Sequence, residues 1–185
     1  MIRNSLPLVF AYLGLAGSYD SKAADAAHPK GGSDESRIAE IRQMMQSVFQ
    51  TYPSPKPPWT DPWAVPSSVI KDFSGDGVIE LTDGRRVRLD GLTCSPDGVA
   101  LLRRILLKPG TKVAIQEKSK KIPVSAAVWT VEESEPPKIY YAPSFVGDFA
   151  VTSGACTPDA SSNSDSLPRY TALLEGMRRI DAQER

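Results

Sequence analysis

Short runs with alternating apolar and polar residues fill the middle of the chain and predict β-strands. The second and third runs are separated by Asp83-Gly84, a pair that favours a tight turn between extended segments. The predicted strands cover residues 69–73, 78–81, 87–89, 112–117 and 124–131.

Four other stretches carry apolar residues at helical spacing. The first is an amphipathic helix over 36–52, ahead of the strands. The second follows Ser95-Pro96-Asp97, a hydroxyl cap, a first-turn proline and an acid that complements the helix dipole. The last two run through 144–154 and onward from Pro168. Three strands, a helix, two strands and two helices are the order of a five-stranded OB-type barrel, so we expect an α+β fold, mainly β, with three helices.

The N-terminal third is organised differently. Arg3, an apolar run over 6–17 and small residues at Ser21-Lys22-Ala23 are typical of a signal peptide over 1–23, which is too short to remain as a membrane span. We therefore predict a periplasmic or secreted protein. Residues 24–66 are interpreted as a disordered segment, the amphipathic helix and a Pro-rich linker carrying Trp59 and Trp63, and 67–185 as the domain. The tryptophans of the linker are expected to pack on the barrel.

Charge and cysteine content narrow the function classes. The 185 residues carry 22 basic and 22 acidic side chains, which disfavours nucleic acid as the main ligand because such binding depends on Lys and Arg against phosphate. Two cysteines, Cys94 and Cys156, allow one disulfide in an oxidising compartment or two separate buried thiols. The single histidine, His28, has no partner nearby that would make a metal site or a catalytic triad.

Several segments of the domain form a recognisable pattern. They are Gly75-Asp76-Gly77 with the strand after it, Asp83-Gly84-Arg85-Arg86-Val87-Arg88-Leu89-Asp90-Gly91-Leu92, and the later segments 126–129 and 149–155. In their order and spacing these segments resemble the staphylococcal nuclease (thermonuclease-like) family. The resemblance covers the chain from about Val69 to the C-terminus, and it implies the nuclease-type barrel and a calcium-dependent phosphodiester hydrolysis.

Few of the residues that this chemistry requires match. Arg88 corresponds to the family's first phosphate-binding arginine, and Asp76 lies near its first metal-binding aspartate, although Gly77 could be the aligned position. Asp97 lies near the catalytic glutamate, with one residue inserted before it. Thr93 stands where the family has its second metal-binding aspartate. The family's second arginine corresponds to about Pro123, and the nearby Lys120 and Lys121 cannot reproduce a guanidinium fork.

The resemblance also implies that Cys94 and Cys156 lie on one side of the barrel, close enough for a disulfide that ties a helix to it. Three readings of the function follow. The first is an exported, non-catalytic binding or structural module without a cofactor, whose partner is an unknown protein or an anionic ligand. The second is an active Ca²⁺-dependent nuclease with ligands rearranged around Asp76, Asp90 and Asp97; a barrel that binds nucleic acid without cutting it is a third, less favoured class.

Overall fold

The computed structural model describes residues 32–57, 59, 67–131 and 145–183. The predicted signal peptide over 1–23, the segment 24–31 with His28, and Trp63 lie outside these residues. Within the described part, no helix is long and apolar enough to cross a membrane. The elements are α2 (Gly32–Thr51), β1 (Ser68–Phe73), β2 (Ile79–Leu81), β3 (Arg86–Leu89), β4 (Leu92–Cys94), α3 (Pro96–Ile105), β5 (Lys112–Glu117), β6 (Val124–Thr130), α4 (Val146–Thr152), β7 (Cys156–Pro158) and α5 (Leu167–Gln183).

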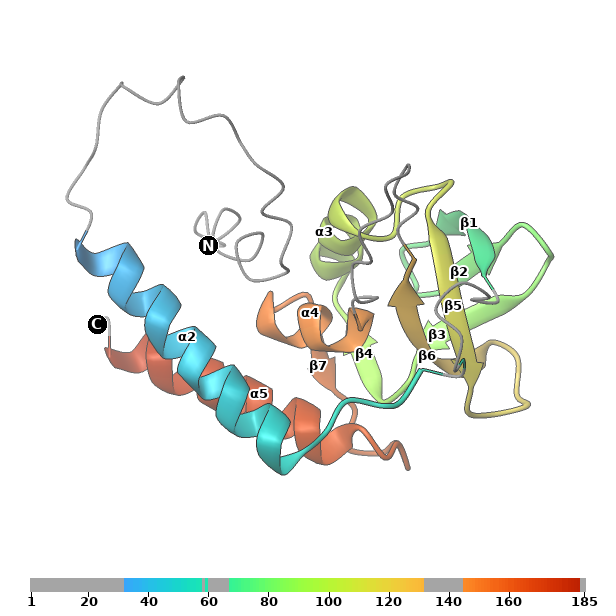
Figure 1. The fold of residues 1–185 in the computed structure, drawn as a ribbon. Helices are drawn as coiled ribbons and strands as arrows, with labels where there is room; N and C mark the ends of the chain where they lie inside the picture. The colour runs from blue at the N-terminus through green and yellow to red at the C-terminus, as the bar shows by residue number, and fades with distance from the viewer. Residues whose placement is uncertain (1–31, 58, 60–66, 132–144, 184–185) are drawn as a thin grey trace, which may run out of the picture.

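Five strands close into a barrel in the order β1-β2-β3-β6-β5. β3 and β6 pair in parallel, with Arg88 opposite Ser125, and the other barrel pairs are antiparallel. The closed five-stranded barrel and the mainly β class with added helices are therefore as the sequence predicted. Figure 1 shows α3 at one end of this barrel and the other helices to one side.

The barrel interior is filled by the alternate residues of its strands. On β3 the exposed Arg86 and Arg88 alternate with the buried Val87 and Leu89, as a half-buried strand requires. Leu102 of α3 is fully buried in the same cluster, so this helix covers the barrel with one apolar face.

A second small sheet was not predicted. β4 and β7 form a two-stranded antiparallel ribbon outside the barrel, with Cys94 opposite Cys156. The predicted strands include neither Leu92–Cys94 nor Cys156–Pro158. A three-residue strand is too short to show an alternation pattern, and its partner lies far away in the sequence.

A second apolar cluster joins the outer face of β5 and β6 to the helices. It includes Met45 and Val48 of α2, Trp129 of β6 and Leu173 of α5. α2 lies along α5 (Figure 1). The edge of Trp59 meets Trp129 with ring centroids 5.7 Å apart, so this tryptophan of the linker packs on the barrel as expected.

Candidate functional site

Arg88 and Asp76 are the two site candidates that the fold brings together. Arg88 projects outward from β3, and Asp76 lies in the turn between β1 and β2. The closest approach of Arg88 Nη2 to Asp76 Oδ2 is 3.9 Å, and about half of each side chain is exposed. A pair this long and this exposed contributes little to stability, so the guanidinium can still bind an anion from solution.

The Asp76 carboxylate accepts hydrogen bonds from neighbouring residues of the same turn. Ser74 Oγ donates a short hydrogen bond to Asp76 Oδ1, and the Val78 amide donates to the same oxygen at 3.3 Å. The Ser74 hydroxyl, the Val78 amide and the charge of Arg88 together lower the pKa of Asp76 below its ordinary value. Asp76 therefore organises the turn, which is one of the two roles the sequence left open for it.

The positions where the family has a second aspartate and a second arginine offer no charge. Thr93 lies exposed in β4 opposite Thr157. Pro123 is half-buried directly before β6, while Lys120 and Lys121 are exposed in the turn before it. Neither a carboxylate for a cation nor a guanidinium fork for phosphate is present at these points.

Asp97 belongs to the start of α3. Ser95 caps that helix by accepting a hydrogen bond from the Gly98 amide at 3.0 Å, and Pro96 and Asp97 form its first turn. Asp97 is exposed and makes no hydrogen bond or ion pair with Arg88 or Asp76. Its place in the first turn, where an acid stabilises the helix dipole, accounts for it structurally.

Asp90, the third acid of the rearranged-site alternative, is buried and held by two serines. Ser125 Oγ and Ser164 Oγ each donate to one of its carboxylate oxygens at 2.5 Å. These bonds join the end of β3 to β6 and to the loop before α5. A buried carboxylate satisfied in this way serves the fold, because its lone pairs are directed at the serine hydroxyls.

Calcium does not fit the residues present. A hard cation of this kind is held by several oxygen ligands, among them charged carboxylates. Among the residues that the structure describes, no group of three or more His, Cys, Asp or Glu side chains could hold a metal. Asp76, Asp90 and Asp97 lie within this described part of the chain and do not form such a group.

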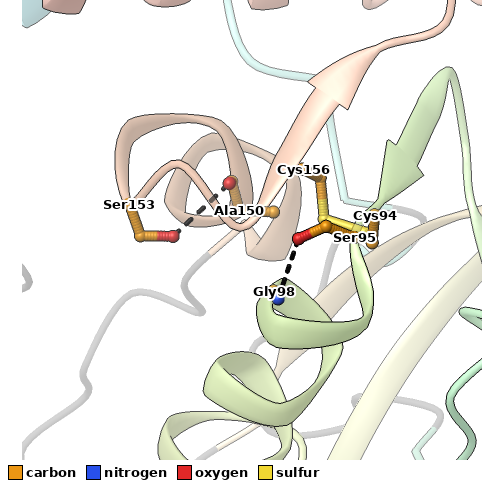
Figure 2. The surroundings of a disulfide bond; sticks show 6 residues. All are labelled: Cys94, Ser95, Gly98, Ala150, Ser153 and Cys156. Atoms are coloured by element: carbon orange, nitrogen blue, oxygen red, sulfur yellow. Dashed lines mark hydrogen bonds between the residues drawn. A yellow bond between two sulfur atoms is a disulfide. The ribbon is translucent and has the colours of Figure 1, made fainter. Parts of the chain in front are cut away.

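A disulfide between Cys94 and Cys156 joins β4 to β7 outside the barrel. The S–S distance is 2.04 Å, and the two residues are 62 apart in the sequence. Figure 2 shows the bond beside Ser95 and Gly98 at the start of α3. A Cβ atom on Gly98 would lie 1.8 Å from the Ala155 carbonyl oxygen. The first turn of α3 thus fits directly against the chain that leads into β7.

One buried polar cluster was missed by the sequence analysis. Arg169 of α5 is 2% exposed, and its Nε and Nη2 atoms contact the two carboxylate oxygens of Asp148 at 2.6 and 2.5 Å. Its Nη1 donates to the Tyr52 carbonyl, and its guanidinium lies 4.1 Å from the centre of the Phe49 ring. Burial raises the pKa of Asp148, and the paired guanidinium opposes that rise. No local sequence signal marks such a pair, since charged residues on helices are usually exposed.

No family model matches this chain, and no similar curated protein was found.

Proposed function

We propose that this chain is an exported OB-type barrel of the staphylococcal nuclease kind that has no catalytic turnover and serves as a binding or structural module. Its partner is a protein or a small ligand that presents an anionic group. Arg88 is the residue we assign to contact that group.

The observation that carries this proposal is that the fold itself holds Asp76 and Asp90, and that of the candidate acids Asp76 alone pairs with Arg88. Asp76 is engaged by Ser74 and the Val78 amide, Asp90 is engaged by Ser125 and Ser164, and Thr93 carries no charge. Hydrolysis of a phosphodiester needs charge next to the phosphorus oxygens and a base near the attacking water. An exposed Arg88 without a second arginine supplies recognition of an anion and little more.

Two further features support the fold and location parts of the proposal. The barrel order, with β3 parallel to β6 and α3 inserted after the third barrel strand, is the arrangement expected of an OB barrel. The Cys94–Cys156 disulfide fits a protein that folds in an oxidising compartment such as the periplasm or the exterior.

The test is a cleavage assay on plasmid and single-stranded DNA with calcium, run beside the Arg88→Ala variant. We expect no cleavage above that of buffer for either protein. Cleavage that a chelator abolishes and that Arg88→Ala lacks would overturn the proposal in favour of an active calcium nuclease.

A binding arm tests the role of Arg88 directly. Pyrophosphate titrated calorimetrically into the wild-type protein should bind weakly, and Arg88→Ala should lose this binding. Arg86→Ala is the matched control, because Arg86 is exposed on the same strand two residues earlier. Equal loss in both variants, or binding unchanged by Arg88→Ala, would remove Arg88 from the role assigned to it.

A further inference from the structure

The turn between β5 and β6 presents an unusual side chain to solvent. Ile122 is 80% exposed, and the other exposed large hydrophobic residue within the described part of the chain is Tyr52 at 38%. Figure 1 shows this turn projecting from the barrel, away from α3 and α5. An isoleucine at a projecting tip therefore stands where a partner could cover it.

Three lysines precede this isoleucine in the same turn. Lys118, Lys120 and Lys121 are all exposed. No carboxylate of the described residues pairs with them. The residues 118–123, which we call the basic turn, thus combine a local positive charge with one aliphatic tip, while the whole chain has a formal net charge of +0.

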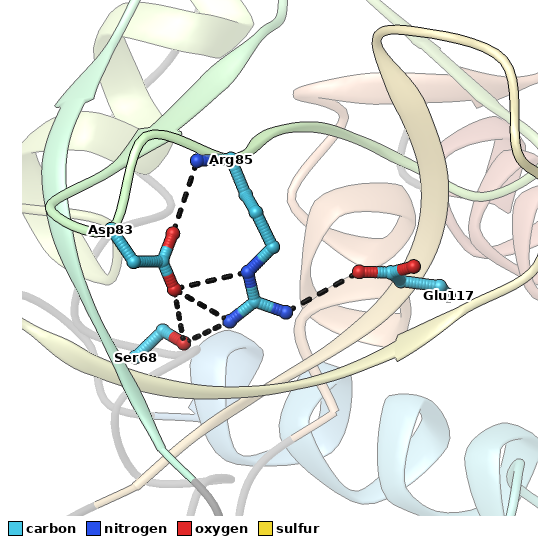
Figure 3. Close-up of polar contacts among 4 residues, drawn as sticks. All are labelled: Ser68, Asp83, Arg85 and Glu117. Atoms are coloured by element: carbon cyan, nitrogen blue, oxygen red, sulfur yellow. Dashed lines mark hydrogen bonds and ion pairs between the residues drawn. The ribbon is translucent and has the colours of Figure 1, made fainter.

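The nearest acid in the sequence is directed elsewhere. Glu117 Oε1 contacts Arg85 Nη1 at 3.3 Å. Arg85 in turn holds Asp83 through its Nε at 3.0 Å and its Nη2 at 2.7 Å (Figure 3). The Glu117 carboxylate is thus directed at Arg85 and forms no ion pair with Lys118, Lys120 or Lys121.

Hydrogen bonds at its base give the basic turn a defined shape. The Lys118 amide donates to the Ser125 carbonyl at 2.7 Å, and the Ser125 amide donates to Ser119 Oγ at 3.0 Å. A turn closed at its base in this way loses little conformational entropy when it binds a surface. The exposed Ile122 therefore lies in a turn whose two ends are held together by hydrogen bonds.

We propose that the basic turn docks this protein onto the surface of an anionic lipid bilayer. Ile122 enters the boundary between headgroups and acyl chains, and the lysines contact lipid phosphates around it. A basic segment with an apolar side chain at its tip has the two features that such a surface recognises.

Nucleic acid fits this turn less well than lipid does. Binding of single strands relies on aromatic side chains that stack with bases, and residues 118–123 contain none. An aliphatic tip gains nothing from a phosphate backbone but gains free energy when it leaves water for an apolar layer. The lipid surface is the partner that uses all four side chains.

The test is co-sedimentation of the full chain with vesicles of phosphatidylcholine alone or mixed with phosphatidylglycerol, at low and high salt. The N-terminal apolar run is present in every sample, so a difference between variants reports on the turn. We expect stronger partition onto the anionic vesicles, weakened by salt. The triple variant Lys118→Gln/Lys120→Gln/Lys121→Gln should lower that partition on the order of 100-fold, and Ile122→Ser about tenfold.

The matched control replaces three exposed lysines elsewhere in the described part of the chain, as Lys56→Gln/Lys71→Gln/Lys108→Gln, and should reduce partition far less. Equal losses in the two triple variants would overturn the proposal, because the effect would then follow total charge. Equal partition of the wild-type chain onto both kinds of vesicle, or no change with Ile122→Ser, would also overturn it. The proposal would also fail if the variant Lys118→Gln/Lys120→Gln/Lys121→Gln lost retention of single-stranded DNA but still bound vesicles as the wild type does.

Discussion

Replacing Arg169 by methionine should leave a buried carboxylate without its partner. Arg169 is 2% exposed and contacts both oxygens of Asp148. Methionine fills a similar volume but donates no hydrogen bond, so the Asp148 carboxyl group loses its charged partner in a site from which water is largely excluded. The Tyr52 carbonyl at the end of α2 loses its donor in the same step.

The expected cost is large for a single substitution. Removing one partner of a buried ion pair costs about 3–5 kcal/mol, and the stacked Phe49 ring adds about 1 kcal/mol for its lost contact with the cation. A domain of this kind is stable by about 5–15 kcal/mol, so Arg169→Met should be strongly destabilised. The double variant Asp148→Asn/Arg169→Met removes the unpaired charge and should recover most of this loss.

The deficit should also depend on pH with a defined sign. Burial already raises the pKa of Asp148, and the guanidinium that opposes the rise is absent from Arg169→Met. A carboxyl whose pKa is higher in the folded than in the unfolded state binds its proton more tightly when folded. Its contribution is therefore favourable at low pH and is lost as the pH rises, so the variant should be less impaired at mildly acidic than at neutral pH.

Urea unfolding of the wild type, both single variants and the double variant provides the coupling energy between the two residues. Arg178→Met, an exposed position on the same helix, is the control and should change stability by less than about 0.5 kcal/mol. The reasoning fails if Arg169→Met costs under about 1 kcal/mol, which is the range of an exposed pair. It fails equally if the double variant is no more stable than Arg169→Met.

Three shorter predictions concern the rest of the fold. Cys94→Ala/Cys156→Ala should lower the free energy of unfolding by about 4 kcal/mol, because the disulfide closes a segment of 62 residues and so restricts the unfolded chain. Urea unfolding should show a similar loss for the reduced wild type. A loss under about 1 kcal/mol would contradict this argument from the entropy of the unfolded chain. Gly98→Ala should destabilise the fold by at least about 1–3 kcal/mol, because the added Cβ atom clashes with the Ala155 carbonyl. Gly75→Ala is the control in the same urea unfolding experiment, since a Cβ atom there meets nothing within 4 Å. The hydrogen bonds from Arg85 lower the pKa of Asp83, so this carboxylate stabilises the fold above its unfolded pKa and loses that effect as the pH falls through the lower folded value. Asp83→Asn should therefore lower the free energy of unfolding by under about 1 kcal/mol at neutral pH and leave it unchanged at low pH. A variant curve parallel to the wild type at all pH values would refute the assignment.

The barrel strands could be predicted because their signals are local. Val87 and Leu89 alternate with Arg86 and Arg88, and an Asp-Gly turn precedes them, so a few consecutive residues define both the strand and its buried face. The start of α3 could be predicted in the same way, because the adjacent residues Ser95 and Pro96 are typical of a helix cap and a first turn, and they occupy these positions. The Cys94–Cys156 bond, expected from the resemblance, is confirmed.

Features that depend on distant pairs could not be predicted in this way. The β4–β7 ribbon joins strands 62 residues apart, and each strand has three residues. Arg169 and Asp148 read as ordinary surface charges until the fold places α2 over them. The serines that bind Asp76 and Asp90 show the same contrast between local and distant partners. Ser74 is two residues from Asp76 and forms a recognisable turn pattern, whereas Ser164 is 74 residues from Asp90.

If the proposed function is correct, the barrel fold has been retained while the reactive residues on its surface have changed. β3 shows why this is possible. Its buried positions, Val87 and Leu89, supply the apolar area that stabilises the sheet, whereas Arg88 between them is exposed and adds little to that sum. Thr93 and Asp97 are exposed as well. Substitutions at such positions cost little stability, so charges needed for a reaction can be lost one at a time with no penalty in folding. Asp90 differs because it is buried and bonded to two serines; replacing it would leave two hydroxyls without an acceptor, which ties this acid to the fold independently of any reaction.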